Sequence, residues 1–301
     1  MIVSWGDTME NEKENAIALK YSREYSVVQA NELVRSKQDN LTLLEAKIVR
    51  LAISQVLEND TDFRTYSCNA QELAKFLGLD KDNVYHELRD ISASLMKKSI
   101  YIKSKTSKRK DGKPNWKMFH WVDSIEYRDG IITFRLSESL KPYLLGLDEL
   151  FTKYSYEALI KLPTTNSIRF YELMASWEMS VIRGAKKTNY TDIPIDDNEF
   201  IFTVDYLREY FNCVDKYPNT GDFIIRVIEK SIAAINKKTL MRVSYRKIKE
   251  GKFIKYLIFK LDDWGETPPE IEEKFARARK ILEELEQQRQ DLDGLEYEYT
   301  L

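Results

Sequence analysis

The chain has 301 residues, of which 43% are hydrophobic and 32% charged, a balance typical of a folded, water-soluble protein with enough sequence for two domains. Its two cysteines, Cys68 and Cys213, are too few for a disulfide framework or a cysteine-rich zinc site, and they fit a reducing, cytoplasmic location. The formal net charge of −2 combines +4 on residues 1–265 with −6 on residues 266–301.

Residues 1–25 are expected to form a flexible N-terminal segment. The start of the chain is acidic and lacks the basic stretch followed by an apolar run that marks a signal peptide. No stretch of the sequence reaches the apolar length needed to cross a bilayer, so no membrane partner is expected.

A first domain is predicted over residues 26–147. Thr42 and Glu45 cap an amphipathic helix, and Asn69 and Glu72 cap a second, shorter helix that Gly78 ends. A third amphipathic helix follows and runs into a Lys-Lys-Ser sequence and a β-rich strand.

This third helix and its strand recur 140 residues later. Residues 82–100 and residues 222–240 share the same order of apolar positions, except that Ile91 corresponds to Ser231, and each helix ends in Lys-Lys-Ser or Lys-Lys-Thr. The second copy, predicted over residues 148–265, also has two earlier helices, one opened by Pro163 and one over residues 203–211. The repeat therefore predicts two domains of one fold.

Each third helix is followed by a strand, a basic loop and a returning strand. The loops cover residues 103–113 and 245–252, and the first copy adds a further hairpin over residues 125–136. Three helices followed by a β-hairpin make a winged helix-turn-helix, so the fold class is α+β with two tandem winged-helix domains. Residues 266–301 are predicted to be an acidic tail, helical or partly disordered, whose heptad-like stripe either docks on the protein itself or meets a partner helix.

The two basic loops and the third helix of the second copy predict a DNA-binding surface. Residues 95–117 carry nine Lys or Arg against one acid, and residues 226–260 carry eleven against two, which suits phosphate neutralisation. Such a helix can enter the major groove while the loop reaches the flanking backbone. The candidate DNA-binding residues are Arg226, Lys230, Lys237, Asn219, Thr220, Arg246, Lys247, Lys249, Lys252, Asn83, Arg89, Lys105, Lys108, Arg109 and Lys110.

The helix over residues 222–237 separates into two faces. One face carries Ile224, Val227, Ile228, Ser231 and Ile235, and the opposite face carries Arg226 and Lys230. Two plainer interpretations stay open: Arg226 and Lys230 as solubilising surface residues, and Asn219 and Thr220 as turn and capping residues. In the first copy the equivalent face, with Asn83, His86, Arg89 and Asp90, is less basic.

In the order and spacing of several short motifs, residues 26–263 resemble the initiator replication proteins of iteron-containing theta-replicating plasmids. The motifs are Asn31–Leu33, Leu44–Ile48, Pro142–Leu144, Phe151–Tyr154, Ile168–Leu173, Phe223–Ile228 and Ile235–Thr239. The chain departs from the pattern at Ile224 and Ile225, where such proteins often have arginines, which leaves open which side chains read bases.

The resemblance implies two winged-helix domains that bind direct repeats of origin double-stranded DNA as a monomer and recruit host replication proteins. It also implies a homodimer that binds an inverted repeat and represses the protein's own gene. A second function stays open, that of a winged-helix transcriptional repressor with no role in replication, because both functions bind DNA by the same chemistry.

Catalytic motifs are missing from the sequence. The two histidines, His86 and His120, are 34 positions apart, whereas a rolling-circle nickase needs two metal-binding histidines one residue apart. Neither Gly112-Lys113 nor Gly251-Lys252 continues into the Ser or Thr of a phosphate-binding loop, and no Cys/His cluster suggests zinc. We therefore expect a DNA-binding protein with no catalytic residues, metal or cofactor.

Overall fold

A computed structural model of the chain describes residues 17–18, 26–79, 83–108, 110–148, 150–182, 193–196 and 198–263. The expectations for most of the N-terminal segment, for Arg109 and for the tail over residues 266–301 lie outside the described residues. Lys105 and Lys108 are described in their backbone only. No helix in the described ranges is both long and apolar enough to span a membrane.

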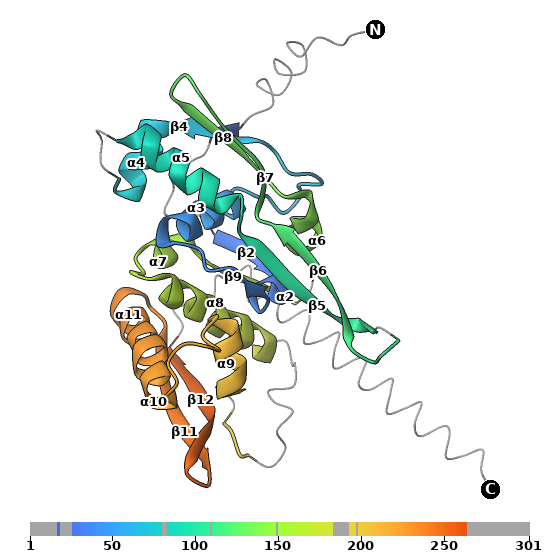
Figure 1. Cartoon of the computed structure of the whole chain (residues 1–301), viewed down its shortest axis with the longest axis vertical. Helices are drawn as coiled ribbons and strands as arrows, with labels where there is room; N and C mark the ends of the chain where they lie inside the picture. Colours follow the sequence, from blue (N-terminus) through green and yellow to red (C-terminus); the bar gives the residue numbers. More distant parts are fainter. Residues whose placement is uncertain are drawn as a thin grey trace, which may run out of the picture.

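The first half of the chain alternates helices and strands (Figure 1). Its helices are α2 (Asn31–Val34), α3 (Leu43–Ile53), α4 (Ala70–Leu77), α5 (Val84–Leu95), a 3-10 turn (Glu138–Leu140) and α6 (Lys141–Leu144). Its strands are β1 (Ile17–Ala18), β2 (Ser26–Ala30), β3 (Lys37–Gln38), β4 (Tyr66–Asn69), β5 (Ser99–Lys108), β6 (Pro114–His120), β7 (Val122–Arg128) and β8 (Ile131–Leu136).

The second half repeats this plan with fewer strands. Its strands are β9 (Phe151–Ser155), β10 (Glu199–Thr203), β11 (Arg242–Glu250) and β12 (Phe253–Asp263). Its helices are α7 (Tyr156–Ile160), α8 (Thr165–Ile182), α9 (Val204–Tyr210), α10 (Thr220–Phe223), a π-helical stretch η2 (Ile224–Glu229) and α11 (Lys230–Lys238).

The predicted cap of α3 is complete, and α4 is capped by Asn69. Thr42 Oγ1 accepts from the Glu45 amide at 3.2 Å while Glu45 Oε2 accepts from the Thr42 amide at 2.7 Å, a complete capping box. The Asn69 carboxamide oxygen accepts from the amides of Gln71 and Glu72. Gly78 ends α4 in the left-handed region, with φ +74°, which a residue with a side chain rarely adopts.

Strand pairing shows that both halves are winged helices, and it corrects the predicted first wing. The strand between the first two helices pairs with the second strand of a later hairpin in both halves, giving the orders β4-β8-β7 and β10-β12-β11. The counterpart of the β11–β12 wing is therefore β7–β8, not the basic hairpin β5–β6. That hairpin forms a separate sheet with β3. Chain order and basic composition favour β5–β6 as the wing, because both hairpins follow α5 and only the strand pairing distinguishes them.

One hydrophobic core continues through both halves of the chain. Strand β2 pairs antiparallel with β9, so segments on either side of the predicted boundary at residues 147/148 share a sheet. Helix α8 packs against α2, α3 and β9 and also against α11. The boundary at 147/148 stays a prediction, but the two sides of it do not have separate cores.

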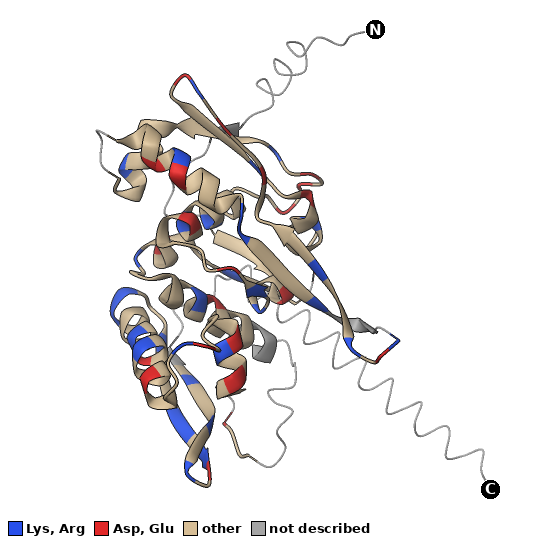
Figure 2. Cartoon of the chain, viewed as in Figure 1, with Lys and Arg blue, Asp and Glu red and all other residues tan. Residues whose placement is uncertain are grey.

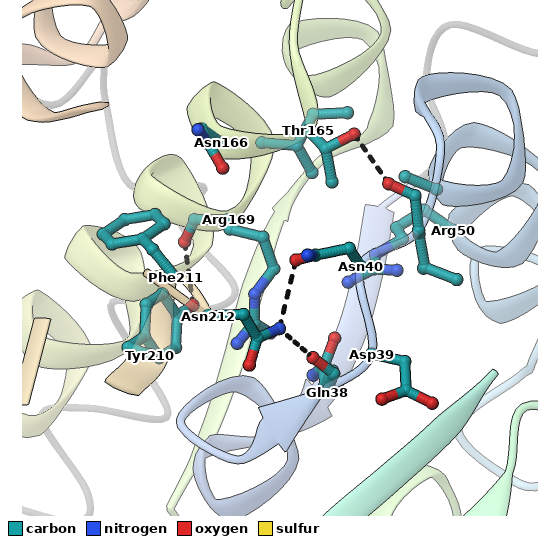
Figure 3. Close-up of a pocket in the computed structure, with 13 residues that line it drawn as sticks. Gln38, Asp39, Asn40, Arg50, Thr165, Asn166, Arg169, Tyr210, Phe211 and Asn212 are labelled. Carbon is teal, nitrogen blue, oxygen red and sulfur yellow. Dashed lines mark hydrogen bonds between the residues drawn. The ribbon is translucent and has the colours of Figure 1, made fainter. Parts of the chain in front are cut away.

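A small pocket lies where the two halves meet, and hydrogen bonds cross it (Figure 3). Asn212 Nδ2 donates to the Gln38 carbonyl oxygen at 2.6 Å and to Asn40 Oδ1 at 3.1 Å. Thr165 Oγ1 donates to the Leu41 carbonyl oxygen at 3.0 Å. These bonds fix the loop after α9 and the start of α8 to the segment that precedes α3.

Candidate nucleic-acid interface

Helix segment 220–238, which runs through α10, η2 and α11, has the two faces that the sequence predicts. The apolar face is buried along its whole length at Ile224, Val227, Ile228, Ser231 and Ile235. The buried Ser231 hydroxyl donates to the Val227 carbonyl oxygen at 2.6 Å, so this polar position in the core is satisfied. The opposite face is solvated, and the Lys and Arg positions of this segment are blue in Figure 2.

Arg226, Lys230 and Lys237 are all exposed on this solvated face. Within residues 198–263, Arg226 forms no ion pair, so its guanidinium is available to a ligand. Asn219 acts as the helix cap, because its Oδ1 accepts from the Gly221 amide at 2.8 Å. Thr220 is the first residue of α10 and is partly buried. The capping interpretation of Asn219 is therefore confirmed.

The helix is fixed to its wing by two sets of side-chain bonds. Asn236 donates to the Val243 carbonyl oxygen at 2.9 Å and accepts from the Val243 amide at 2.8 Å. The Tyr245 hydroxyl donates to Glu229 Oε1 at 2.5 Å. Burial, followed by this bond to Glu229, raises the pKa of Tyr245, so the phenol keeps its proton. These contacts hold helix segment 220–238 and β11 in a fixed position relative to each other.

Lysines surround the turn of the second wing. Lys249 and Lys252 flank Glu250-Gly251 and are exposed, and Gly251 adopts φ +58° there. Lys247 Nζ lies 3.7 Å from Glu229 Oε1 and is partly exposed. Figure 2 marks Lys and Arg positions both on α11 and along β11, and the side-chain bonds of Asn236 and Tyr245 hold these two elements together.

Arg246, also on β11, forms bonds within the protein. Its Nε and Nη2 bond to Glu199 at 3.1 and 2.9 Å, and Nη2 also donates to the Pro194 carbonyl oxygen at 2.9 Å. The bond to Arg246 lowers the pKa of Glu199, which keeps the carboxylate charged. These bonds join β11 to the start of β10, so Arg246 stabilises the sheet, while its contact with DNA stays a prediction.

The first domain presents a less basic face, as the sequence predicts. Asn83 and Arg89 are exposed on the start of α5, and Arg89 Nη2 lies 3.0 Å from Asp90 Oδ1. Tyr85 packs edge-to-face on Tyr127 of the β7–β8 wing, with ring centroids 5.1 Å apart. This face is aromatic and carries balanced charge, in contrast with the face of α11.

The remaining candidates lie on the β5–β6 hairpin. Lys110 is exposed in its turn, and Lys105 and Lys108 are in β5. Figure 1 shows this hairpin projecting away from α11 and from the β11–β12 turn. Arg226, Lys230 and Lys237 therefore lie on helix segment 220–238 and Lys247, Lys249 and Lys252 on the wing that is bonded to it, whereas the hairpin lysines lie on a separate hairpin.

Two features of the surface were not predicted. Ile225 is a large apolar residue that is exposed on the solvated side of the helix, three residues after Asp222 and four before Glu229. The link between Tyr245 and Glu229 depends on strand and helix packing, so no local sequence signal could have found it. Within the described ranges, no group of His, Cys, Asp and Glu is arranged to hold a metal ion.

Comparisons with known proteins agree with this architecture. The family model described as "Initiator Replication protein, WH1" matches residues 26–175, and the model described as "Initiator Rep protein, WH2" matches residues 203–261. A replication initiation protein of Escherichia coli is 25% identical over 222 residues, which are 72% of this chain and 65% of that protein, just under two thirds of its length.

A solved structure shares the fold. The crystal structure of Pi initiator protein in complex with iteron DNA aligns with a TM-score of 0.61 and 20% identity, covering 82% of this chain and all of that one. With both winged-helix family models matched in chain order, the chain belongs to the family of plasmid replication initiator proteins.

Proposed function

We propose that this chain initiates plasmid replication by binding repeated origin DNA through one basic surface. That surface, called the basic face below, consists of Arg226, Lys230 and Lys237 on the helix and Lys247, Lys249 and Lys252 on the wing. The observation that carries the proposal is the contrast between the two sides of helix segment 220–238. Its apolar side is fully used by the core, and its basic side is solvated and fixed to the wing.

The geometry gives separate tasks to the helix and the wing. The start of a recognition helix lies against base edges in the major groove, where an arginine can bond to O6 and N7 of guanine. Arg226 lies near the start of the helix and is suited to that contact. The lysines of α11 and of the β11–β12 turn neutralise phosphates, which contributes affinity and register without reading sequence.

The protein acts by binding rather than by catalysis, and it acts in the cytoplasm. Binding to direct repeats positions the chain beside an AT-rich segment that opens, and host replication proteins are recruited there. A dimer on an inverted repeat represses the protein's own gene. Each step uses the same DNA-binding chemistry and needs no metal or cofactor.

A plasmid replication assay tests this function. A small plasmid should carry the direct repeats and AT-rich segment that lie beside the gene, with the chain supplied from a second plasmid. We expect replication to require the repeats and to be lost when Arg226 and Lys230 are both replaced by Ala. If the chain binds only an inverted repeat at its promoter and never supports replication, it is a repressor and not an initiator.

Binding to this DNA should depend steeply on salt, with an equal contribution from each phosphate contact. Lys249→Ala should weaken binding to the repeat and to random DNA by similar factors and reduce the slope of log K against log salt by about one unit. Titrations at several salt concentrations measure the slope. Lys110→Ala removes the same charge from the β5–β6 turn and should leave the slope unchanged, because that hairpin projects away from the basic face. An equal change for both variants would show that the hairpin also contacts phosphates.

A further inference from the structure

We infer that Ile225 reads DNA sequence by packing on the 5-methyl group of a thymine, beside the base pair that Arg226 contacts. The inference rests on the proposed function and assigns a second base-reading residue to the basic face. It concerns a part of the helix where the side chain is apolar and yet points away from the core.

Burial separates Ile225 sharply from its neighbours. Ile224 is fully buried, whereas Ile225 has 53% of its surface exposed. Val227 and Ile228 complete the core contacts of this turn, so Ile225 is left outside the packed side. A β-branched residue is a poorer helix former than the charged residues around it, so neither packing nor helix propensity explains isoleucine at this position.

The neighbours of Ile225 on the solvated face indicate what it contacts. Asp222 and Glu229 lie three and four residues away, and Arg226 follows directly. Glu229 Oε1 is held by the Tyr245 hydroxyl at 2.5 Å, so that carboxylate is committed to the wing. The first turns of the helix therefore present to the major groove the guanidinium group of Arg226 and, beside it, the compact apolar side chain of Ile225.

Only one groove feature of a base pair is matched by an apolar side chain. The major-groove edge of thymine carries a methyl group, and cytosine at the same position has none. A single isoleucine surrounded by charged residues is too small for a protein docking surface, which usually spans a few hundred square ångströms. The chemistry therefore favours a thymine methyl, next to the guanine that Arg226 is suited to contact.

Replacing thymine by uracil in the bound repeat removes only this methyl group. One thymine at a time should be replaced, and the dissociation constant of the full chain measured for each duplex. For the unsubstituted protein we expect one position at which uracil weakens binding on the order of fourfold, the effect of one buried methyl group. Ile225→Ala should bind thymine and uracil equally there, while Arg226→Ala should keep the difference.

Leu240→Ala is the matched control, because Leu240 is also an exposed apolar residue, with 71% of its surface accessible, but it lies beyond the end of α11. This variant should keep the full difference between thymine and uracil. The inference is overturned if Ile225→Ala retains that difference, or if no thymine in the repeat shows one. If the unsubstituted chain binds the repeat no better than random DNA, the proposed function fails as well, so the two failures are distinguishable.

Discussion

Glu172→Gln is expected to lower the free energy of unfolding by about 3–5 kcal/mol, the cost of leaving a buried charge without its partner. The side chains of Arg50 and Glu172 are 1% and 0% exposed, and they are joined by two bonds, at 2.9 and 3.1 Å. The Tyr154 hydroxyl also donates to Glu172 Oε1, at 2.5 Å, and Gln29 Nε2 approaches the same oxygen at 3.4 Å. The cluster joins α3, α8, β9 and β2. Urea unfolding followed by circular dichroism measures the loss.

The double variant Arg50→Met with Glu172→Leu is the control for this prediction. Because it removes both charges and fills the space with apolar atoms, it should be more stable than Glu172→Gln alone. If the single and double variants are equally destabilised, the loss comes from packing and not from an unpaired arginine.

Acid should remove the same stabilisation. Burial has the largest single effect and raises the pKa of Glu172, but the charge and hydrogen bonds of Arg50, together with Arg169 and Tyr154, outweigh it, so the net direction is downward. A lowered pKa means that the stabilisation is complete above the ordinary glutamate pKa of about 4.3 and is lost as the pH falls toward the lower value of the folded state. Glu172→Gln should therefore lose less stability than the unsubstituted protein over that acidic range.

Arg226→Ala is expected to weaken binding to the origin repeat by about 1–3 kcal/mol and binding to random DNA by much less, if Arg226 bonds to a base. Arg226 is exposed near the start of the helix and forms no ion pair within residues 198–263, so its loss breaks no ion pair there. Competition titrations with repeat and random duplexes at one salt concentration give both affinities.

Arg226→Lys separates charge from geometry. Lysine keeps the positive charge but lacks the planar fork that bonds to two guanine atoms at once. This variant should bind random DNA nearly as well as the unsubstituted protein and lose most of the preference for the repeat. Equal losses on both DNAs for Arg226→Ala would show instead that Arg226 contacts phosphate, and the base-reading residue would have to be sought elsewhere.

Local features of the sequence predicted much of the fold. The capping box at Thr42 and Glu45 and the left-handed stop at Gly78 are determined by residues a few positions apart, so both could be read directly. The two faces of helix segment 220–238 followed from spacing alone, because a helix places every third or fourth residue on one side.

What the sequence did not predict depends on residues far apart in the chain. The identity of the first wing follows from the pairing of β4 with β8, and the role of Arg246 follows from Glu199, 47 residues away. Arg50 and Glu172, 122 residues apart, look like solvated charges in sequence, because charged residues are rarely buried unless they are paired. Patterns within one segment cannot reveal such partners.

The shared helix α8 has a thermodynamic consequence. Its Glu172 belongs to the buried cluster with α3, β2 and β9, while the same helix packs against α11 behind the basic face. The two winged helices therefore cannot unfold as independent units without exposing part of this common helix. DNA binding to the basic face should therefore stabilise the first domain as well. A ligand stabilises every part of the chain that must remain folded for it to bind. Amide hydrogens in α3, far from the bound DNA, would then exchange more slowly in the complex than in the free protein.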